Sequence, residues 1–145
     1  MKTLQLWQDV VTVTADGQSG NVVEVVQGRG SWLDCAGVPA IALKIEIYYL
    51  TTNSKLVLET AASEEGPWSK IAESTSPMSE TIYAATEESA VYKLLRFVRW
   101  RFEVPSGATQ AYAATFRAWW SPQELVAVPQ RTGGRAALAV NRREV

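Results

Sequence analysis

The sequence predicts an all-β protein, an antiparallel β-sandwich of about eight strands in a jelly-roll or related Greek-key order. Three observations predict this fold. Apolar and polar residues alternate along several segments, and turn-forming residues separate these segments about every eight to twelve positions. The segment 91–104 also places a Trp and a Phe on one face, and such rings need a second apolar layer to cover them.

The N-terminal part of the chain contains the first two strand regions. Residues 4–7 and 10–14 are expected to form one or two short strands that end at the turn 15–20. Residues 21–27, NVVEVVQ, form a second β-branched run. The two regions are expected to pair as a hairpin, and residues 31–40 follow as a connection interrupted by Gly and Pro.

Residues 41–50, IALKIEIYYL, are predicted as a core strand. Its two faces differ in polarity, with Ile41, Leu43, Ile45, Ile47 and Tyr49 on one face and Lys44 and Glu46 on the other. A helix would scatter these apolar residues around its circumference, so the strand is preferred. The polar turn 51–54 has the length of a hairpin loop, and residues 55–61 are expected to return with Leu56 and Leu58 inward.

The next strands are shorter and less regular. The turn 63–68 leads into an extended segment at 68–74, and residues 79–86 form another short strand. The acidic turn 87–89 then leads into the segment 91–104. The break at Ser76-Pro77 and the acidic turn 87–89 therefore divide this part of the chain into separate strands.

The segment 91–104, VYKLLRFVRWRFEV, is the longest strand signal in the chain. From Val98 it alternates, with Val98, Trp100, Phe102 and Val104 inward and Arg99, Arg101 and Glu103 outward. Residues 110–120 alternate in the same way, place Trp119 outward, and are expected to pair with this strand. Arg99 and Arg101 beside Trp119 then form the best candidate patch for a protein contact.

The chain is predicted to consist of one sandwich domain, residues 1–121, and an extended basic arm, residues 122–145. The domain holds ten Lys or Arg and thirteen Asp or Glu, a charge of −3, whereas the arm holds four Arg and two Glu, a charge of +2. The arm has too few bulky apolar residues for a core, although a short helix at 135–140 is an alternative. Its arginines are further candidate interface residues: Arg131, Arg135, Arg142 and Arg143. Four dispersed arginines make nucleic-acid binding an unfavoured interpretation.

The residue types available for chemistry are limited. The chain has no His and a single cysteine, Cys35, so an intrachain disulfide and a multi-cysteine metal site are excluded. The absence of His removes the commonest general base and metal ligand. No cofactor, no metal and no catalytic residue are expected, and no apolar run approaches the roughly 18 residues of a membrane-spanning helix. The N-terminus reads as the first strand and not as a secretion signal.

Two tryptophans lie in or beside predicted loops. Trp32, next to Leu33 in the connection 31–40, is expected to cover one end of the core. Trp68 follows the turn 63–68. Exposed aromatic rings on sandwich loops can stack on sugars, so Trp32 and Trp68 are candidate ligand-stacking residues, with core packing as the other interpretation.

Several stretches resemble a group of small phage and prophage β-sandwich proteins. They are LQLWQDVVTV at the start, LVLETAASEEGPWSKIAEST from Leu56, LLRFVRWRFEV from Leu94, and an aromatic last strand. In those proteins a hairpin of the form L-x-V-x-x-E-T-S-x-x-G-x-W is followed by an R-[FY]-[VL]-R-[VW] strand. The resemblance covers roughly residues 1–120 and implies a virion structural protein, such as a capsid decoration or cement protein or a minor head or tail component.

These observations lead to a functional hypothesis. The chain is expected to be a non-enzymatic virion protein, made in the host cytoplasm, that binds the major capsid protein or other virion proteins as a homo-oligomer, with a trimer favoured. The outward Arg and Trp face and the basic arm motivate it. The alternative from another class is a carbohydrate-binding sandwich module that uses the loop tryptophans.

Overall fold

The structure is a computed structural model, and it describes residues 3–16, 24–105 and 110–123. Its elements are β1 (Gln5–Asp16), β2 (Glu24–Val26), a 3-10 turn (Arg29–Ser31), β3 (Leu33–Asp34), β4 (Ala40–Leu50), β5 (Lys55–Ala61), β6 (Ser69–Ser74), β7 (Met78–Ala85), β8 (Tyr92–Lys93), β9 (Phe97–Glu103) and β10 (Ala111–Gln123). The all-β class expected from the alternating pattern is confirmed. Within the described residues, no helix is long and apolar enough to cross a membrane.

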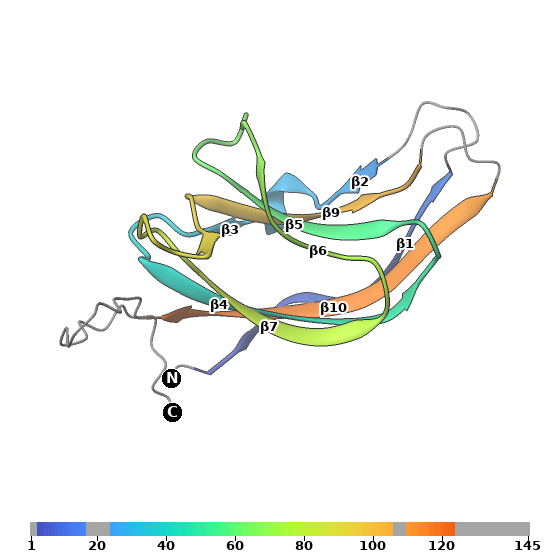
Figure 1. The fold of residues 1–145 in the computed structure, drawn as a ribbon, viewed down its shortest axis with the longest axis horizontal. Helices are drawn as coiled ribbons and strands as arrows, with labels where there is room; N and C mark the ends of the chain where they lie inside the picture. The colour runs from blue at the N-terminus through green and yellow to red at the C-terminus, as the bar shows by residue number, and fades with distance from the viewer. Residues whose placement is uncertain (1–2, 17–23, 106–109, 124–145) are drawn as a thin grey trace.

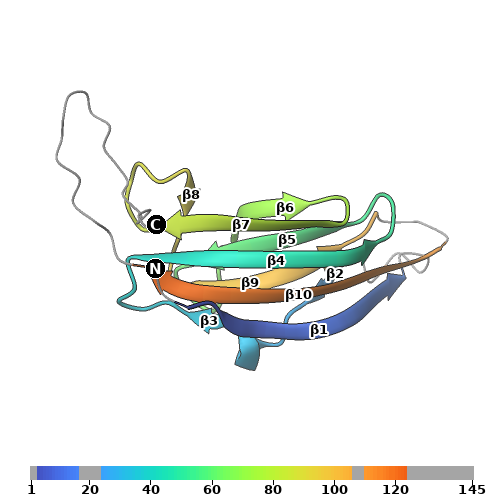
Figure 2. The ribbon, with the colours of Figure 1, turned by 90° about the horizontal axis from the view of Figure 1, so that it is seen from below.

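The strands form two sheets packed face to face (Figure 1). The first sheet has the order β1-β10-β4-β7-β8, and the second has the order β2-β9-β5-β6, with β3 also paired to β9. Figure 2 shows β7, β4, β10 and β1 side by side in the first sheet. Without the two-residue strands β3 and β8, the eight remaining strands follow the orders 1-8-3-6 and 2-7-4-5, which is the jelly-roll arrangement.

The core lies between the inner faces of the two sheets. Most predicted inward residues are buried, including Ile41, Leu43, Ile45, Ile47, Leu56, Leu58, Val98, Trp100, Phe102, Val104, Tyr112, Ala114, Phe116 and Ala118. Trp100 from the second sheet and Phe116 from the first meet edge to face, with ring centroids 5.0 Å apart. The two-layer core that the rings of 91–104 require is therefore present.

The segment 91–104 is not one strand, contrary to the prediction. Its first part, β8, runs parallel to β7 in the first sheet, whereas β9 belongs to the second sheet. The chain crosses between the sheets at Leu94, which is 1% exposed and donates its N–H to the Ala85 carbonyl. Because the crossing begins with the buried Leu94 and the half-buried Leu95, its apolar residues continue the strand pattern without a turn signal.

Two predicted hairpins are also wrong. β1 pairs with β10 and β2 pairs with β9, so the first two strands lie in different sheets. The turn after β4 likewise leads to β5 in the second sheet. Here Thr51 and Ser54 close the corner, with the Ser54 hydroxyl donating to the Thr51 carbonyl at 2.6 Å. A short polar turn carries the same sequence signal whether it joins neighbouring strands or opposite layers.

The inward alternation of β4 ends at Ile47 and not at Tyr49 as predicted. Tyr49 is 54% exposed instead of inward, whereas Leu50 is 7% exposed. The pairing with β10 shifts here, since Thr115 is opposite Tyr49 and Phe116 is opposite Ile47. Tyr48 is the extra residue of this bulge, so both tyrosines are solvent-exposed.

Candidate protein interface

The patch predicted from Arg99, Arg101 and Trp119 does not exist as one surface. The two arginines lie on β9 in the second sheet, whereas Trp119 lies on β10 in the first. β10 pairs with β1 and β4 and not with the segment 91–104, which corrects the expected pairing. Outward residues of the two sheets therefore face opposite sides of the sandwich. β10 extends to Gln123, and the four arm arginines, Arg131, Arg135, Arg142 and Arg143, lie outside the described residues.

Arg99 and Arg101 belong to an ion-pair network on the second sheet. Both contact the Glu59 carboxylate, with N–O distances of 2.6 Å for Arg99 and 3.0 Å for Arg101. Arg101 also pairs with Glu103 at 2.6 Å and with Glu24 at 3.4 Å. The Glu59 side chain is only 4% exposed, so its contacts with the two arginines are well shielded from water. The two charges are thus balanced inside the protein, and the assignment of both arginines to an interface stays a prediction.

Trp32 and Trp68 are brought together on the same side of the sandwich. Their ring centroids are 4.8 Å apart in an edge-to-face contact. The Arg99 guanidinium lies 3.8 Å from the Trp68 centroid and 5.1 Å from that of Trp32, and the Trp32 Nε1 donates to the Gln27 carbonyl. Both rings are half-buried, and Arg99 covers one face of the Trp68 ring.

The exposed apolar side chains gather on the first sheet. Six large hydrophobic residues are exposed among the described residues, and five of them lie on strands of this sheet: Leu6, Val10, Tyr48, Tyr49 and Tyr83. The sixth, Val91, lies just before β8. We call the outward surface of β1, β10, β4 and β7 the aromatic face, made of these five residues with Trp119, Lys44, Glu46, Thr115 and Arg117. An apolar patch with polar residues among it is typical of a protein interface.

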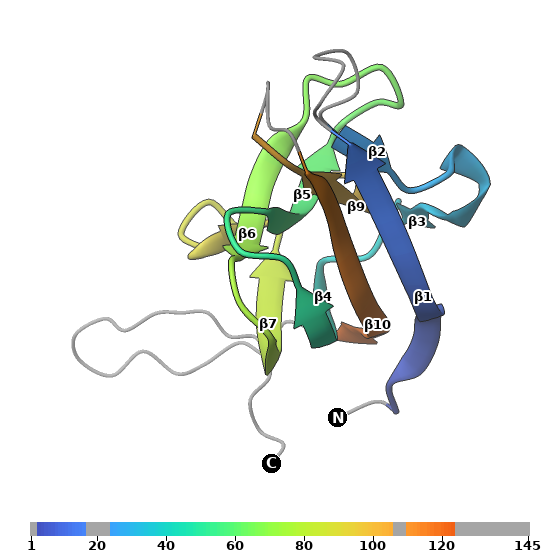
Figure 3. The same ribbon diagram turned by 90° about the vertical axis from the view of Figure 1, so that its right-hand side faces the viewer.

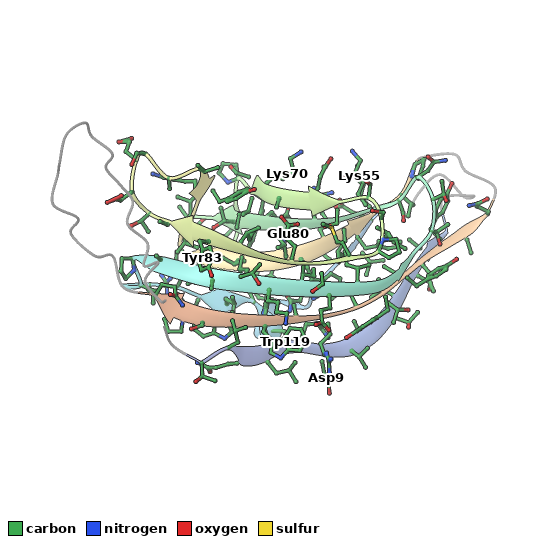
Figure 4. The ribbon with its side chains drawn as sticks, turned by 60° about the horizontal axis from the view of Figure 1, so that its bottom comes forward. Asp9, Lys55, Lys70, Glu80, Tyr83 and Trp119 are labelled. Atoms are coloured by element: carbon green, nitrogen blue, oxygen red, sulfur yellow. The ribbon has the colours of Figure 1, made fainter. Side chains whose placement is uncertain are left out.

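Trp119 lies at the centre of the aromatic face. It is opposite Leu6 on β1 and opposite Lys44 on β4. The Lys44 Nζ is 5.1 Å from the ring centroid, and the Arg117 guanidinium is 4.6 Å from it. In Figure 4, Trp119 and Tyr83 lie on the near sheet, whereas Lys55 and Lys70 come from the other sheet. Two cations thus hold the indole in place as part of a wide, shallow surface.

Glu46 links the polar residues of the aromatic face. Its carboxylate accepts a hydrogen bond from the Tyr48 hydroxyl at 2.6 Å and pairs with Lys44 at 3.5 Å and Arg117 at 3.4 Å. The Tyr48 hydrogen bond, followed by that from Arg117, holds the pKa of Glu46 below its ordinary value. Tyr48 and Arg117 are therefore fixed in place before any partner binds.

The interior offers no room for an organic ligand at the cavity beside β7. This cavity has a volume of about 10 Å³, enough for roughly one water molecule, and is lined by Ile45, Leu56, Leu58, Ala72, Ser74, Glu80 and Ile82. Across the described ranges, no three His, Cys, Asp or Glu side chains are grouped so that they could hold a metal ion. The aromatic face is consequently the strongest candidate site.

Sequence patterns did not identify the aromatic face. The alternation in β4 placed Tyr49 inward, and nothing in the sequence indicated that Tyr48 forms a bulge. In the sequence, Leu6 and Val10 indicate only the strand segments 4–7 and 10–14. The adjacent pair Tyr48-Tyr49 was the available signal, because neighbouring residues on a regular strand cannot both point inward.

The fold and surface define a jelly-roll β-sandwich protein with a partly apolar outer surface on its first sheet. The sequence matches no protein-family model, no curated protein and no solved structure.

Proposed function

We propose that this chain is a non-enzymatic structural protein of a phage particle, which decorates or cements the capsid through protein–protein contacts. Its partner is the major capsid protein or another virion protein. The single observation that supports this proposal most is the aromatic face, because among the described residues five exposed large hydrophobic side chains lie on strands of one sheet and none on strands of the other.

The contrast between the two outer surfaces favours the first sheet as the contact. The outward charges of the second sheet are matched within the protein, with Arg99, Arg101, Lys55 and Lys70 pairing with Glu24, Glu59, Glu73 and Glu103. A partner would have to break these pairs to bind there. On the aromatic face, a partner instead covers apolar surface that water now contacts, which is the main source of binding free energy.

The jelly-roll order is compatible with this proposal but does not select it. Jelly rolls occur in viral capsid proteins and in lectins. Function depends on the site and not on the fold. The resemblance of the strands to phage β-sandwich proteins and the geometry of the aromatic face together favour the structural role over the lectin-like one.

Co-sedimentation with capsids of the encoding phage tests the proposal. We expect the full-length chain to pellet with the particles and the double variant Val10→Ser/Tyr49→Ser to bind at least about tenfold more weakly, since tyrosines are enriched among the interface residues whose truncation costs more than about 1 kcal/mol. Lys55→Ser/Lys70→Ser, on the opposite sheet, is the matched control and should bind as the parent does. Equal binding by all three proteins would refute the aromatic face as the contact.

The basic arm is a separate part of the proposal. We expect Arg131, Arg135, Arg142 and Arg143 to contribute electrostatic contacts to the particle. Replacing all four with Ser in the full-length chain should lower the affinity and flatten its dependence on salt. An unchanged salt dependence would remove the arm from the mechanism.

Carbohydrate binding is the second proposal, supported by the contact of Trp32 with Trp68 on one surface. Trp68→Ala should then abolish glycan binding while leaving particle binding intact. A glycan array without any signal, or a Trp68→Ala variant that binds glycans as the parent does, would refute this proposal.

A further inference from the structure

β1 forms one edge of the first sheet (Figure 3). It pairs with β10 along one side, and no strand within the described ranges pairs with its other side. The pairing is irregular between Leu6 and Val11, but residues 11–16 then pair with β10 in six consecutive positions. The C-terminal half of β1 is therefore a regularly paired strand, and one of its sides has no partner strand among the described residues.

β6 and β7, at or next to the ends of the two sheets, differ from β1. β6 carries Lys70 and Glu73, and charged side chains on an edge disfavour pairing with a further strand. The end of β7 is covered by β8, which pairs with Ala84 and Ala85. In contrast, β1 reads Val-Thr-Val-Thr-Ala from Val11 and has no charge until Asp16. This edge lacks the residues that usually prevent strand addition.

The inward side chains of this edge are incompletely covered. Val11 and Val13 pack against the core but are only half-buried, whereas Phe116 and Ala114, their partners on β10, are fully buried. The difference arises because, among the strands that the structure describes, β10 has a neighbour on both sides and β1 on only one. A further strand beside β1 would complete the burial of both valines.

We propose that residues 11–15 of β1 pair antiparallel with the same residues of a second copy of this chain, about a two-fold axis at Val13. In this register Val13 is opposite Val13, Val11 is opposite Ala15, and Thr12 is opposite Thr14. The valines and Ala15 meet on the inner face of the joined sheet, and the threonine hydroxyls meet on the outer face. Cross-strand Thr pairs are favourable, and this register places no like charges opposite each other. The occupant is a second copy because the segment is complementary to itself.

This contact joins the first sheets of two copies into one continuous sheet. Backbone hydrogen bonds supply the affinity and the valine and threonine pairs fix the register, as in other strand additions. The contact is made through the edge and leaves the aromatic face open. The dimer can therefore form whether or not the chain binds a capsid, so the tests of the two proposals fail independently.

The mass of the full-length protein in solution is the first test. We expect a species of twice the 16.0 kDa chain mass by light scattering, with slow hydrogen exchange at residues 11–15. A monomer would overturn the proposal. The trimer expected from the sequence would overturn it too, because two-fold strand pairing closes at two copies.

Disulfide trapping tests the register. Thr12→Cys and Thr14→Cys are substitutions at exposed positions, and the native Cys35 is buried. In the proposed register, position 12 of one copy is directly opposite position 14 of the other, at about 4.5–5.5 Å between Cα atoms, which a disulfide can bridge. Position 12 of one copy would be about 7–8 Å from position 12 of the other, which is too far.

Mixing the two single variants under mild oxidation should therefore give a disulfide-linked dimer, while each variant alone should not. The parent chain, with only Cys35, is the control. Absence of the linked dimer in the mixture, or equal linking in the single variants, would overturn the proposed pairing.

Discussion

Glu59 on β5 and Arg99 on β9 are opposite each other in the second sheet, with 2.6 Å between Oε2 and Nε. Their side chains are 4% and 14% exposed, so water hardly screens the pair. Arg101, two residues after Arg99 on β9, pairs with the other oxygen of the same carboxylate. A carboxylate shared by two arginines in this position joins the two central strands of the sheet.

Replacing Glu59 should destabilise the protein strongly. Glu59→Ala leaves two partly buried guanidinium groups without their shared carboxylate, and we expect a loss of about 3–5 kcal/mol in the free energy of unfolding. Urea denaturation measures this loss. Glu65→Ala, in the exposed turn before β6, is the control and should change stability by less than about 0.5 kcal/mol. Similar stabilities for the two variants would contradict the role of the network.

Gln8 should stabilise the packing of the two sheets. Its Oε1 on β1 accepts a hydrogen bond from Nε1 of Trp100 on β9, at 2.8 Å. Gln8→Ala leaves the indole N–H without its partner inside the sandwich, so we expect a loss of about 1–3 kcal/mol in urea unfolding. Gln5→Ala, at an exposed position of the same strand, should be nearly neutral. If both variants are equally stable, this bond does not contribute.

Gly66 should be intolerant of a side chain. Its φ is +91°, and a Cβ there would lie 2.9 Å from Cδ1 of Trp68. Gly66→Ala should therefore destabilise the protein by about 1–3 kcal/mol and shift the tryptophan fluorescence. Gly28→Ala is the matched control, because its φ is −60° and no atom lies within 4 Å of the added Cβ. A stable Gly66→Ala variant with unchanged fluorescence would contradict the described loop.

Cys35 should make the fold sensitive to alkaline pH. Burial, assisted by the charge of Asp34, raises the pKa of its thiol from 9.0 to about 12. Because the folded-state pKa is above the unfolded value, the stabilising contribution is complete below about pH 9 and is lost as the pH rises toward 12. The free energy of unfolding should fall more steeply over this range for the parent than for Cys35→Ala. Parallel pH profiles would contradict this assignment.

Alternation predicted the strands well where they are regular. The inward faces of β4, β5, β9 and β10 are those expected, because a half-buried strand records its buried face in every second residue. The alternating pattern gave wrong predictions at a β-bulge and where the chain crosses between the sheets. The bulge at Tyr48 turns Tyr49 outward, against the alternation of β4. The buried Leu94 hides the boundary between β8 and β9, because an apolar residue there continues the strand pattern.

The candidate site could not be predicted in the same way. Arg99 and Trp119 have the right outward orientation, but only the pairing of strands decides which outward residues share a surface. The sequence pattern predicts one surface for both residues, whereas the structure places them on the outer faces of opposite sheets. Trp32 and Trp68 show the reverse, since they are distant in sequence and in contact in space.

By itself, the sequence determined the all-β class, the two-layer core and the inward face of most strands, because these depend on a period of two residues and on local turns. The tertiary structure alone decided the jelly-roll order, the gathering of Leu6, Tyr49 and Trp119 on one face, and the place of β1 at the end of the first sheet's strand order. These features depend on which strands become neighbours, and that choice is made by backbone hydrogen bonds between segments far apart in the chain.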